Sequence, residues 1–101
     1  MRKKVYSASI TPLEEDGSLD VVGLNKIFDR NIRHGIDGFF ILGSMGEWSR
    51  FSGDFRDRLV AESVKAVAGR AELLVGITAQ TMAGALDNLK RASVYAFDSY
   101  V

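Results

Sequence analysis

The stretch Phe39-Phe40-Ile41-Leu42-Gly43-Ser44-Met45-Gly46-Glu47 joins a strand pattern to a turn that contains two glycines. Its four opening apolar residues show no period-2 alternation, which is typical of a strand buried on both faces, as in a parallel sheet. Glycines in the turn let the backbone bend sharply and approach a ligand. Parallel α/β folds bind their ligands at this carboxyl end of the strands. The pattern predicts either a ligand-binding turn, with the amides of Ser44 and Met45 and the Ser44 hydroxyl directed at an anion, or a plain βα turn.

Three more strand-like segments accompany this one, and helical patterns separate the four. The expected strands are Tyr6–Ile10, Gly38–Leu42, Leu73–Ile77 and Phe97–Val101. The expected helices are Asp20–His34, Asp54–Ala68 and Met82–Tyr95. Their expected N-caps are Asp20, Ser52 and Thr81, and Gly35 and Gly69 are expected to end the first two helices. The core candidates of the third helix are Leu86, Leu89 and Val94. Strand and helix alternating in this way form the βαβ pattern of a parallel sheet, so the predicted class is α/β. Periodicity alone leaves a closing barrel and an open sheet as alternatives.

A weak internal repeat supports the alternating pattern. The segment 34–39 resembles the segment 95–100, and each places an acidic residue, Asp37 or Asp98, between the end of a helix and the start of a strand. We therefore expect the same connection to occur twice in one sheet.

Composition excludes several classes of function. The chain has 13 acidic and 13 basic residues, so there is no electrostatic reason to expect nucleic acid or a membrane surface as a partner. No apolar run approaches the ~20 residues that span a bilayer, and no signal-type segment follows the start of the chain. Cysteine is absent and histidine occurs once, which argues against a disulfide framework and a multi-histidine metal site. We expect a cytoplasmic protein without a bound metal.

Five motifs, read in order, resemble the dihydrodipicolinate synthase and N-acetylneuraminate lyase superfamily of pyruvate-dependent aldolases. They are Thr11-Pro12, Asp16-Gly17-Ser18-Leu19-Asp20, Gly35-Ile36-Asp37-Gly38, Gly43-Ser44-Met45-Gly46-Glu47 and the run from Ala68-Gly69-Arg70 to Val75-Gly76. The resemblance implies a (β/α)₈ TIM barrel, with residues 1–101 as the N-terminal part of its single domain: three βα units and the start of strand four. Because such barrels have ~250 residues, we expect a portion of a longer enzyme. Two alternatives are a non-catalytic half-barrel fragment that persists only by association, and an open flavodoxin-like sheet that binds phosphate at the turn.

The resemblance also implies a chemistry. Family enzymes form a Schiff base between a lysine and a 2-oxo acid such as pyruvate, without a further cofactor. Ser44 matches the position that contacts the substrate carboxylate and joins a proton relay with tyrosines, whereas Met45 stands where threonine is common and offers only its amide. Glu47 matches a structural carboxylate, and Tyr100 is expected to be a packing residue. None of the five lysines ends a predicted strand: Lys3, Lys4, Lys26, Lys65 and Lys90. The resemblance implies that the Schiff-base lysine and the relay tyrosine come from later strands, after Val101. The full-length protein is expected to be a homo-oligomer, a dimer or a tetramer.

Overall fold

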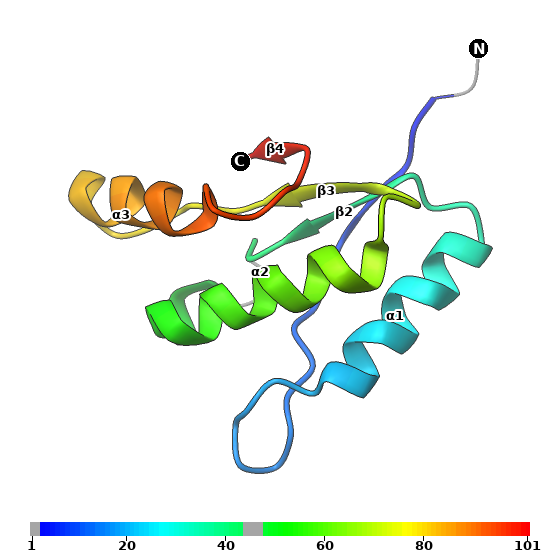
Figure 1. Cartoon of the computed structure of the whole chain (residues 1–101), viewed down its shortest axis with the longest axis horizontal. Helices are drawn as coiled ribbons and strands as arrows, with labels where there is room; N and C mark the ends of the chain where they lie inside the picture. Colours follow the sequence, from blue (N-terminus) through cyan, green and yellow to red (C-terminus); the bar gives the residue numbers. More distant parts are fainter. Residues whose placement is uncertain (1–2, 44–47) are drawn as a thin grey trace.

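The computed structural model describes residues 3–43 and 48–101, and within them strands and helices alternate as the sequence predicts (Figure 1). The elements are β1 (Tyr6–Ala8), α1 (Val21–Arg33), β2 (Gly38–Ile41), a short 3₁₀ helix η1 (Trp48–Arg50), α2 (Gly53–Val67), β3 (Glu72–Val75), α3 (Met82–Ala92) and β4 (Ser99–Tyr100). Every predicted strand and helix is present, although the strands are shorter than predicted. None of the helices in the described ranges is long and apolar enough to cross a membrane.

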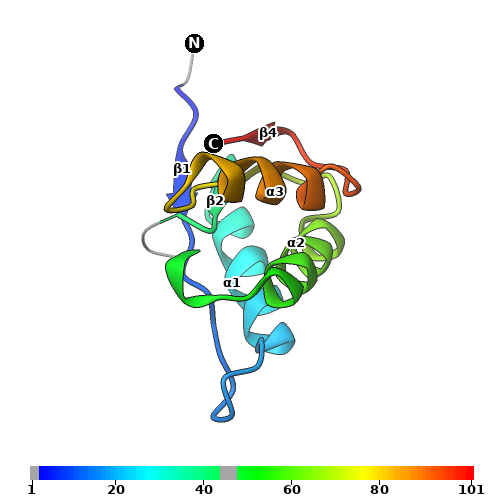
Figure 2. The ribbon, with the colours of Figure 1, turned by 90° about the vertical axis from the view of Figure 1, so that its left-hand side faces the viewer.

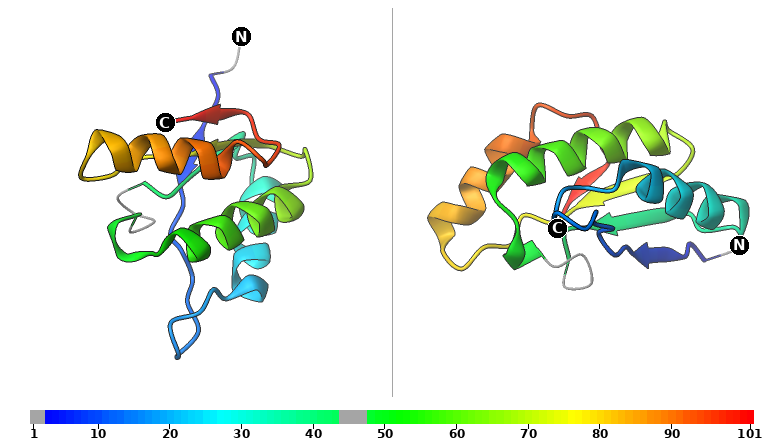
Figure 3. Two further views of the ribbon diagram at one scale, coloured as in Figure 1. Left: turned by 60° about the vertical axis from the view of Figure 1, so that its left-hand side comes forward. Right: turned by 90° about the horizontal axis from the view of Figure 1, so that it is seen from below.

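The four strands form one parallel sheet in the order β1-β2-β3-β4. Gly38 of β2 pairs with Tyr6 of β1 on one side and with Glu72 of β3 on the other. The three helices lie on the same side of the sheet (Figures 2 and 3). Sequential strand order with all helices on one side is the arrangement of a barrel that is closing, whereas an open doubly wound sheet carries helices on both faces.

All three predicted N-caps are confirmed. The side chains of Asp20, Ser52 and Thr81 each accept a hydrogen bond from the backbone N–H three residues later, at 2.8, 3.2 and 3.0 Å. Each cap satisfies a backbone donor that the first turn of a helix would otherwise leave without a partner. The end of α2 differs from the prediction, because Ala68 (φ 50°) already takes the left-handed conformation before Gly69 (φ 75°) does.

The core lies between the helices and the sheet. The rings of Phe28 in α1 and Phe39 in β2 are fully buried, with centroids 4.6 Å apart. Each such side chain stabilises the fold by about 1.5–3 kcal/mol relative to its exposed state. The fully buried aliphatic side chains around this layer include Leu24, Leu42, Leu59 and Val75.

The prediction for the inner face of α3 is wrong at two of three positions. Leu86 is 52% exposed and Val94 is 78% exposed, and only Ala92 of this helix is buried. The helix ends at Ala92, so Val94 lies in the turn beyond it rather than on a helical stripe. Leu86 lies on a part of α3 that the described residues cover only in part.

Candidate functional site at the carboxyl edge of the sheet

The predicted site residues, Ser44 and Met45, lie outside the described residues, as do Gly46 and Glu47. What the structure describes is the chain on either side of them. β2 ends at Ile41 and is followed by Leu42 and Gly43. The next described element is η1, which begins at Trp48. Both flanks lie at the carboxyl edge of the sheet (Figure 1), the edge at which the sequence predicts the ligand.

Leu42 directs the chain away from the sheet. Its φ is 60°, a left-handed conformation that is uncommon for residues other than glycine, and its side chain is 1% exposed. The next residue, Gly43, lies against the ring of Phe40, because a Cβ there would be 2.8 Å from Phe40 Cε2. A bulky residue held in this conformation needs surrounding contacts that fix it. The exit from β2 is therefore a strained and closely packed point.

Gly76, at the end of the neighbouring strand, supplies one of those contacts. Its N–H donates to the Ile41 carbonyl at 2.9 Å. A Cβ at position 76 would lie 2.4 Å from the carbonyl oxygen of Leu42, so only glycine lets the two backbones approach this closely. Gly76 thus limits where the Leu42 carbonyl can lie.

Arg56 of α2 holds Gly76 from the helix side. Its Nη2 donates to the Gly76 carbonyl at 2.9 Å, and the residue is only 8% exposed. Burial lowers the pKa of the guanidinium, and the negative charge of Asp57 opposes that effect. Arginine remains protonated at any physiological pH, so a positive charge is kept beneath the carboxyl edge.

Sequence reasoning did not single out Arg56 as a functional residue. A signal was nevertheless present. Position 56 falls on the helical stripe of Leu59, Ser63 and Val67, all of which are buried, so its side chain had to enter the protein.

Asn88 of α3 holds the residues that follow Gly76. Its Nδ2 donates to the Ile77 carbonyl at 3.1 Å and to the Thr78 carbonyl at 3.4 Å. Two helices therefore fix three successive carbonyl groups after β3. A cavity of about 370 Å³ adjoins this segment and is lined by Ser49, Phe51, Gly53, Arg56, Thr78, Ala79, Gln80, Asp87, Asn88 and Arg91.

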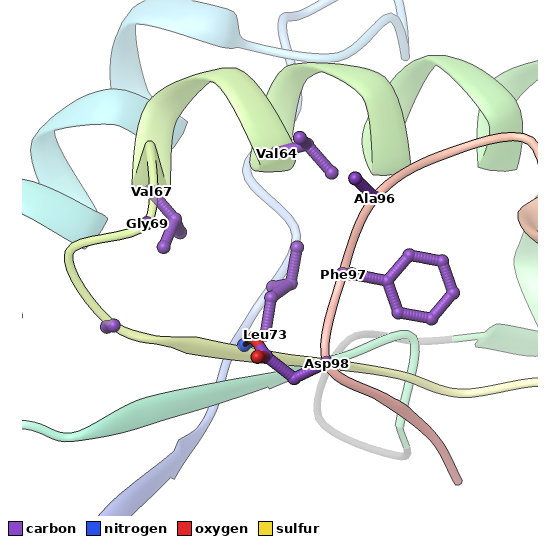
Figure 4. Close-up of a pocket in the computed structure, with 8 residues that line it drawn as sticks. Val64, Val67, Gly69, Leu73, Ala96, Phe97 and Asp98 are labelled. Carbon is purple, nitrogen blue, oxygen red and sulfur yellow. Dashed lines mark hydrogen bonds between the residues drawn. The ribbon is translucent and has the colours of Figure 1, made fainter.

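A second cavity, of about 320 Å³, lies at the opposite, amino edge of the sheet (Figure 4). Val64 of α2, Leu73 of β3 and Ala96 of the segment before β4 line it. Among the described residues, Asp98 is the one charged residue that lines it, and its carboxylate accepts a hydrogen bond from the Leu73 N–H. This cavity holds none of the residues that the sequence assigns to the chemistry.

The amino edge also holds Lys4, the lysine nearest to a strand. Its Nζ lies 3.2 Å from Glu72 Oε2, which also accepts a hydrogen bond from the Tyr6 hydroxyl at 2.7 Å. The other lysines are Lys3, which precedes β1, and Lys26, Lys65 and Lys90, which lie in helices. None of the five lies at the carboxyl end of a strand. Tyr100 lies in β4 with its ring edge-on to Phe97 at 5.0 Å, and it is 42% exposed, so it packs on one side only.

Known proteins match this chain in both sequence and structure. It is 32% identical to the probable 2-dehydro-3-deoxy-D-pentonate aldolase YjhH of Escherichia coli, over 97% of this chain and 34% of that protein. It is 37% identical to the 4-hydroxy-tetrahydrodipicolinate synthase of an Azoarcus species, over 78% of this chain and 27% of that protein. The structure superposes with a TM-score of 0.90, at 26% identity, on YagE, a prophage protein of the dihydrodipicolinic acid synthase family from E. coli solved in complex with pyruvate. That match covers 96% of this chain and 33% of YagE.

The chain thus spans about a third of the length of the relatives it matches. The sequence model of the dihydrodipicolinate synthetase family matches residues 1–101. This chain therefore belongs to that family, and its three βα units and fourth strand are the opening part of the family's (β/α)₈ barrel.

Proposed function

We propose that the gene product carrying this chain is a Schiff-base-forming lyase or synthase that acts on pyruvate or a related 2-oxo acid. The observation that carries the proposal is the family match over all 101 residues, together with a relative, YagE, whose structure contains pyruvate. The two flanks of the predicted turn lie at the carboxyl edge of a parallel sheet, where barrels of this kind bind their substrates.

The covalent step needs a lysine amine at that edge. The amine adds to the ketone carbon of the 2-oxo acid, and loss of one water molecule leaves a positively charged iminium. When the bond between C3 and C4 of the 2-oxo acid breaks, its electron pair forms the C2=C3 double bond of an enamine, and the iminium nitrogen becomes neutral. Bond formation is the reverse step, with C3 of the enamine as the carbon nucleophile. Because the five lysines here precede β1 or lie in helices, we assign the nucleophile to residues outside 1–101. We assign the relay tyrosine to the same later part of the barrel from the resemblance to the family.

Ser44 and Met45 hold the substrate in this proposal. The two backbone amides donate to the carboxylate of the 2-oxo acid, and the Ser44 hydroxyl also transfers a proton in the relay. Met45 contributes its amide alone, which distinguishes this chain from relatives with threonine at the position.

We also propose that the gene product is a homo-oligomer. Met82 and Leu86 lie one turn apart on α3 and are 77% and 52% exposed, so residues outside 1–101 can cover them, either later units of the same barrel or a second copy of the protein. A cytoplasmic location remains a prediction from the sequence.

Sodium borohydride tests the proposed function. Incubation of the gene product with pyruvate and borohydride reduces any iminium to a secondary amine, so activity is lost and the protein gains the mass of the reduced adduct. Borohydride without pyruvate is the control and leaves the protein unchanged. If pyruvate and related 2-oxo acids give no adduct, the proposed function is wrong.

The alternative is a non-catalytic half-barrel that persists by association. The exposed aromatic residues of the two outer strands, Tyr6 in β1 and Tyr100 in β4, favour a partner chain against the sheet. Size-exclusion chromatography and circular dichroism of the 101-residue polypeptide distinguish the two readings, because a folded and discretely self-associated species supports the fragment.

A further inference from the structure

The position of the Leu42 carbonyl depends on an arginine from a different element. Arg56 Nη2 donates to the Gly76 carbonyl, the Gly76 N–H donates to Ile41, and the Gly76 Cα lies against the Leu42 carbonyl. These contacts form an unbroken path from α2, through the end of β3, to the point at which the chain leaves β2.

The path is closely packed. The void that Leu42, Arg56 and Gly76 share with neighbouring side chains is only about 10 Å³. A space of this size is at the lower limit for one water molecule, so the guanidinium has little room to move away from the Gly76 carbonyl.

Burying a charged side chain here has a cost in free energy, because desolvation opposes the charged form of Arg56. A hydrogen bond from a charged donor is stronger than one from a neutral donor. An arginine therefore fixes the Gly76 carbonyl more firmly than a neutral side chain would. Leu42, held with φ 60°, is a residue whose conformation needs such support.

We propose that Arg56 is a positioning residue for binding of the 2-oxo acid. By fixing Gly76 it fixes the Leu42 carbonyl and Gly43, from which the predicted substrate-binding residues follow directly in the chain. This inference rests on the proposed function, since it assigns the turn after Gly43 to the substrate carboxylate.

The test compares KM with kcat in variants of the complete gene product. Arg56→Met keeps the length of the side chain but removes the donor. We expect it to raise KM for the 2-oxo acid by roughly tenfold, the loss of about one charged hydrogen bond, with little change in kcat. Arg56→Lys keeps the charge, and its KM is expected to lie between those of Arg56→Met and the unsubstituted protein.

Arg70→Met is the matched control. Arg70 follows the opposite end of α2 and donates to Asp29 and to the Ala66 carbonyl, both at 2.6 Å. Its loss is expected to lower the melting temperature and leave KM unchanged. Gly76→Ala perturbs the path from its other end, and we expect it to raise KM with Arg56 intact.

The inference is wrong if folded Arg56 variants keep the KM of the unsubstituted protein, or if Arg70→Met raises KM equally. If Arg56→Met does not fold, the comparison of Arg56→Lys with Arg70→Met decides. A different experiment tests the proposed function itself. If the unsubstituted protein gives no borohydride adduct with a 2-oxo acid, both proposals are wrong.

Discussion

Asp37 and Asp98 occupy equivalent places, 61 residues apart, and make the same pair of hydrogen bonds. Asp37 Oδ2 accepts from the Val5 N–H at 2.7 Å, and the Asp37 N–H donates to the Val5 carbonyl at 2.8 Å. Asp98 Oδ2 accepts from the Leu73 N–H at 2.8 Å, and the Asp98 N–H donates to the Leu73 carbonyl at 3.0 Å. Each aspartate thus ties the start of its own strand to the start of the preceding strand, which confirms the repeat seen in the sequence.

This relationship predicts how the two residues respond to substitution. Asp98→Ala removes the acceptor for the Leu73 N–H and is expected to destabilise the gene product by about 1–2 kcal/mol. Asp98→Asn keeps an acceptor oxygen and is expected to cost less than half as much. Urea unfolding of the two variants measures the difference, and equal losses would show that the charge, rather than the hydrogen bond, is what matters.

A second prediction concerns pH. Hydrogen bonds from the Tyr6 hydroxyl and the Lys4 ammonium hold the pKa of Glu72 below its ordinary value of 4.5. The unfolded chain therefore binds a proton at Glu72 at a higher pH than the folded chain does. The contribution of Glu72 is complete at neutral pH and is lost as the pH falls from about 4.5 through the folded pKa.

Glu72→Gln is expected to make the unfolding free energy less dependent on pH below 4.5. Tyr6→Phe, which removes the first cause of the lowered pKa, is expected to act in the same direction. Urea midpoints at pH 7 and pH 3 measure the effect. A Glu72→Gln variant with the same pH dependence as the unsubstituted protein would contradict this account of the network.

A third prediction concerns Gly38, which lies between Tyr6 and Glu72 in the sheet. A Cβ at position 38 would be 2.5 Å from Tyr6 Cδ1, so the tyrosine ring crosses directly over the glycine to reach Glu72. Gly38→Ala is expected to destabilise the protein by about 1–3 kcal/mol through overpacking. In a Tyr6→Ala background the same substitution should cost little, and a cost that is equal in both backgrounds would exclude the ring as its cause.

The sequence was sufficient for the order and type of the elements, because the caps and the apolar runs carry that information locally. Residue type and position alone predict Asp20, Ser52 and Thr81 as caps, and the structure has all three. The faces of α3 were not predictable in the same way. Leu86 fits a buried helical stripe, but its burial depends on which elements lie beside the helix.

The contacts that hold the end of β2 at the carboxyl edge could not be predicted from the sequence either. Gly76 and Leu42 are 34 residues apart, and only the sheet register brings their backbones into contact. Arg56 is three residues beyond Gly53 on α2. No nearby residue in the sequence indicates that its side chain contacts the end of β3. Contacts of this kind arise from tertiary structure. The turn at 43–47, in contrast, can be predicted locally from its two glycines.

The fourth prediction separates the roles of the two proposed substrate-binding residues. Ser44→Ala is expected to lower kcat by roughly 10²–10⁴-fold, as for the loss of a proton-transfer group, with part of the iminium formation retained. Met45→Thr is expected to preserve catalysis and to tighten binding of the 2-oxo acid by ~1 kcal/mol. Steady-state kinetics measure both. If Ser44→Ala changes only KM, the hydroxyl is a binding contact and has no part in proton transfer.

The most direct test of the account is to locate the lysine that reacts. The gene product is incubated with pyruvate and borohydride, digested, and mapped by mass spectrometry, with the isolated 101-residue polypeptide treated in parallel. We predict one stoichiometric adduct on a lysine outside residues 1–101 and no labelling of the isolated polypeptide. A stoichiometric adduct on any of the five lysines of this chain, or no adduct on the gene product, would contradict the account.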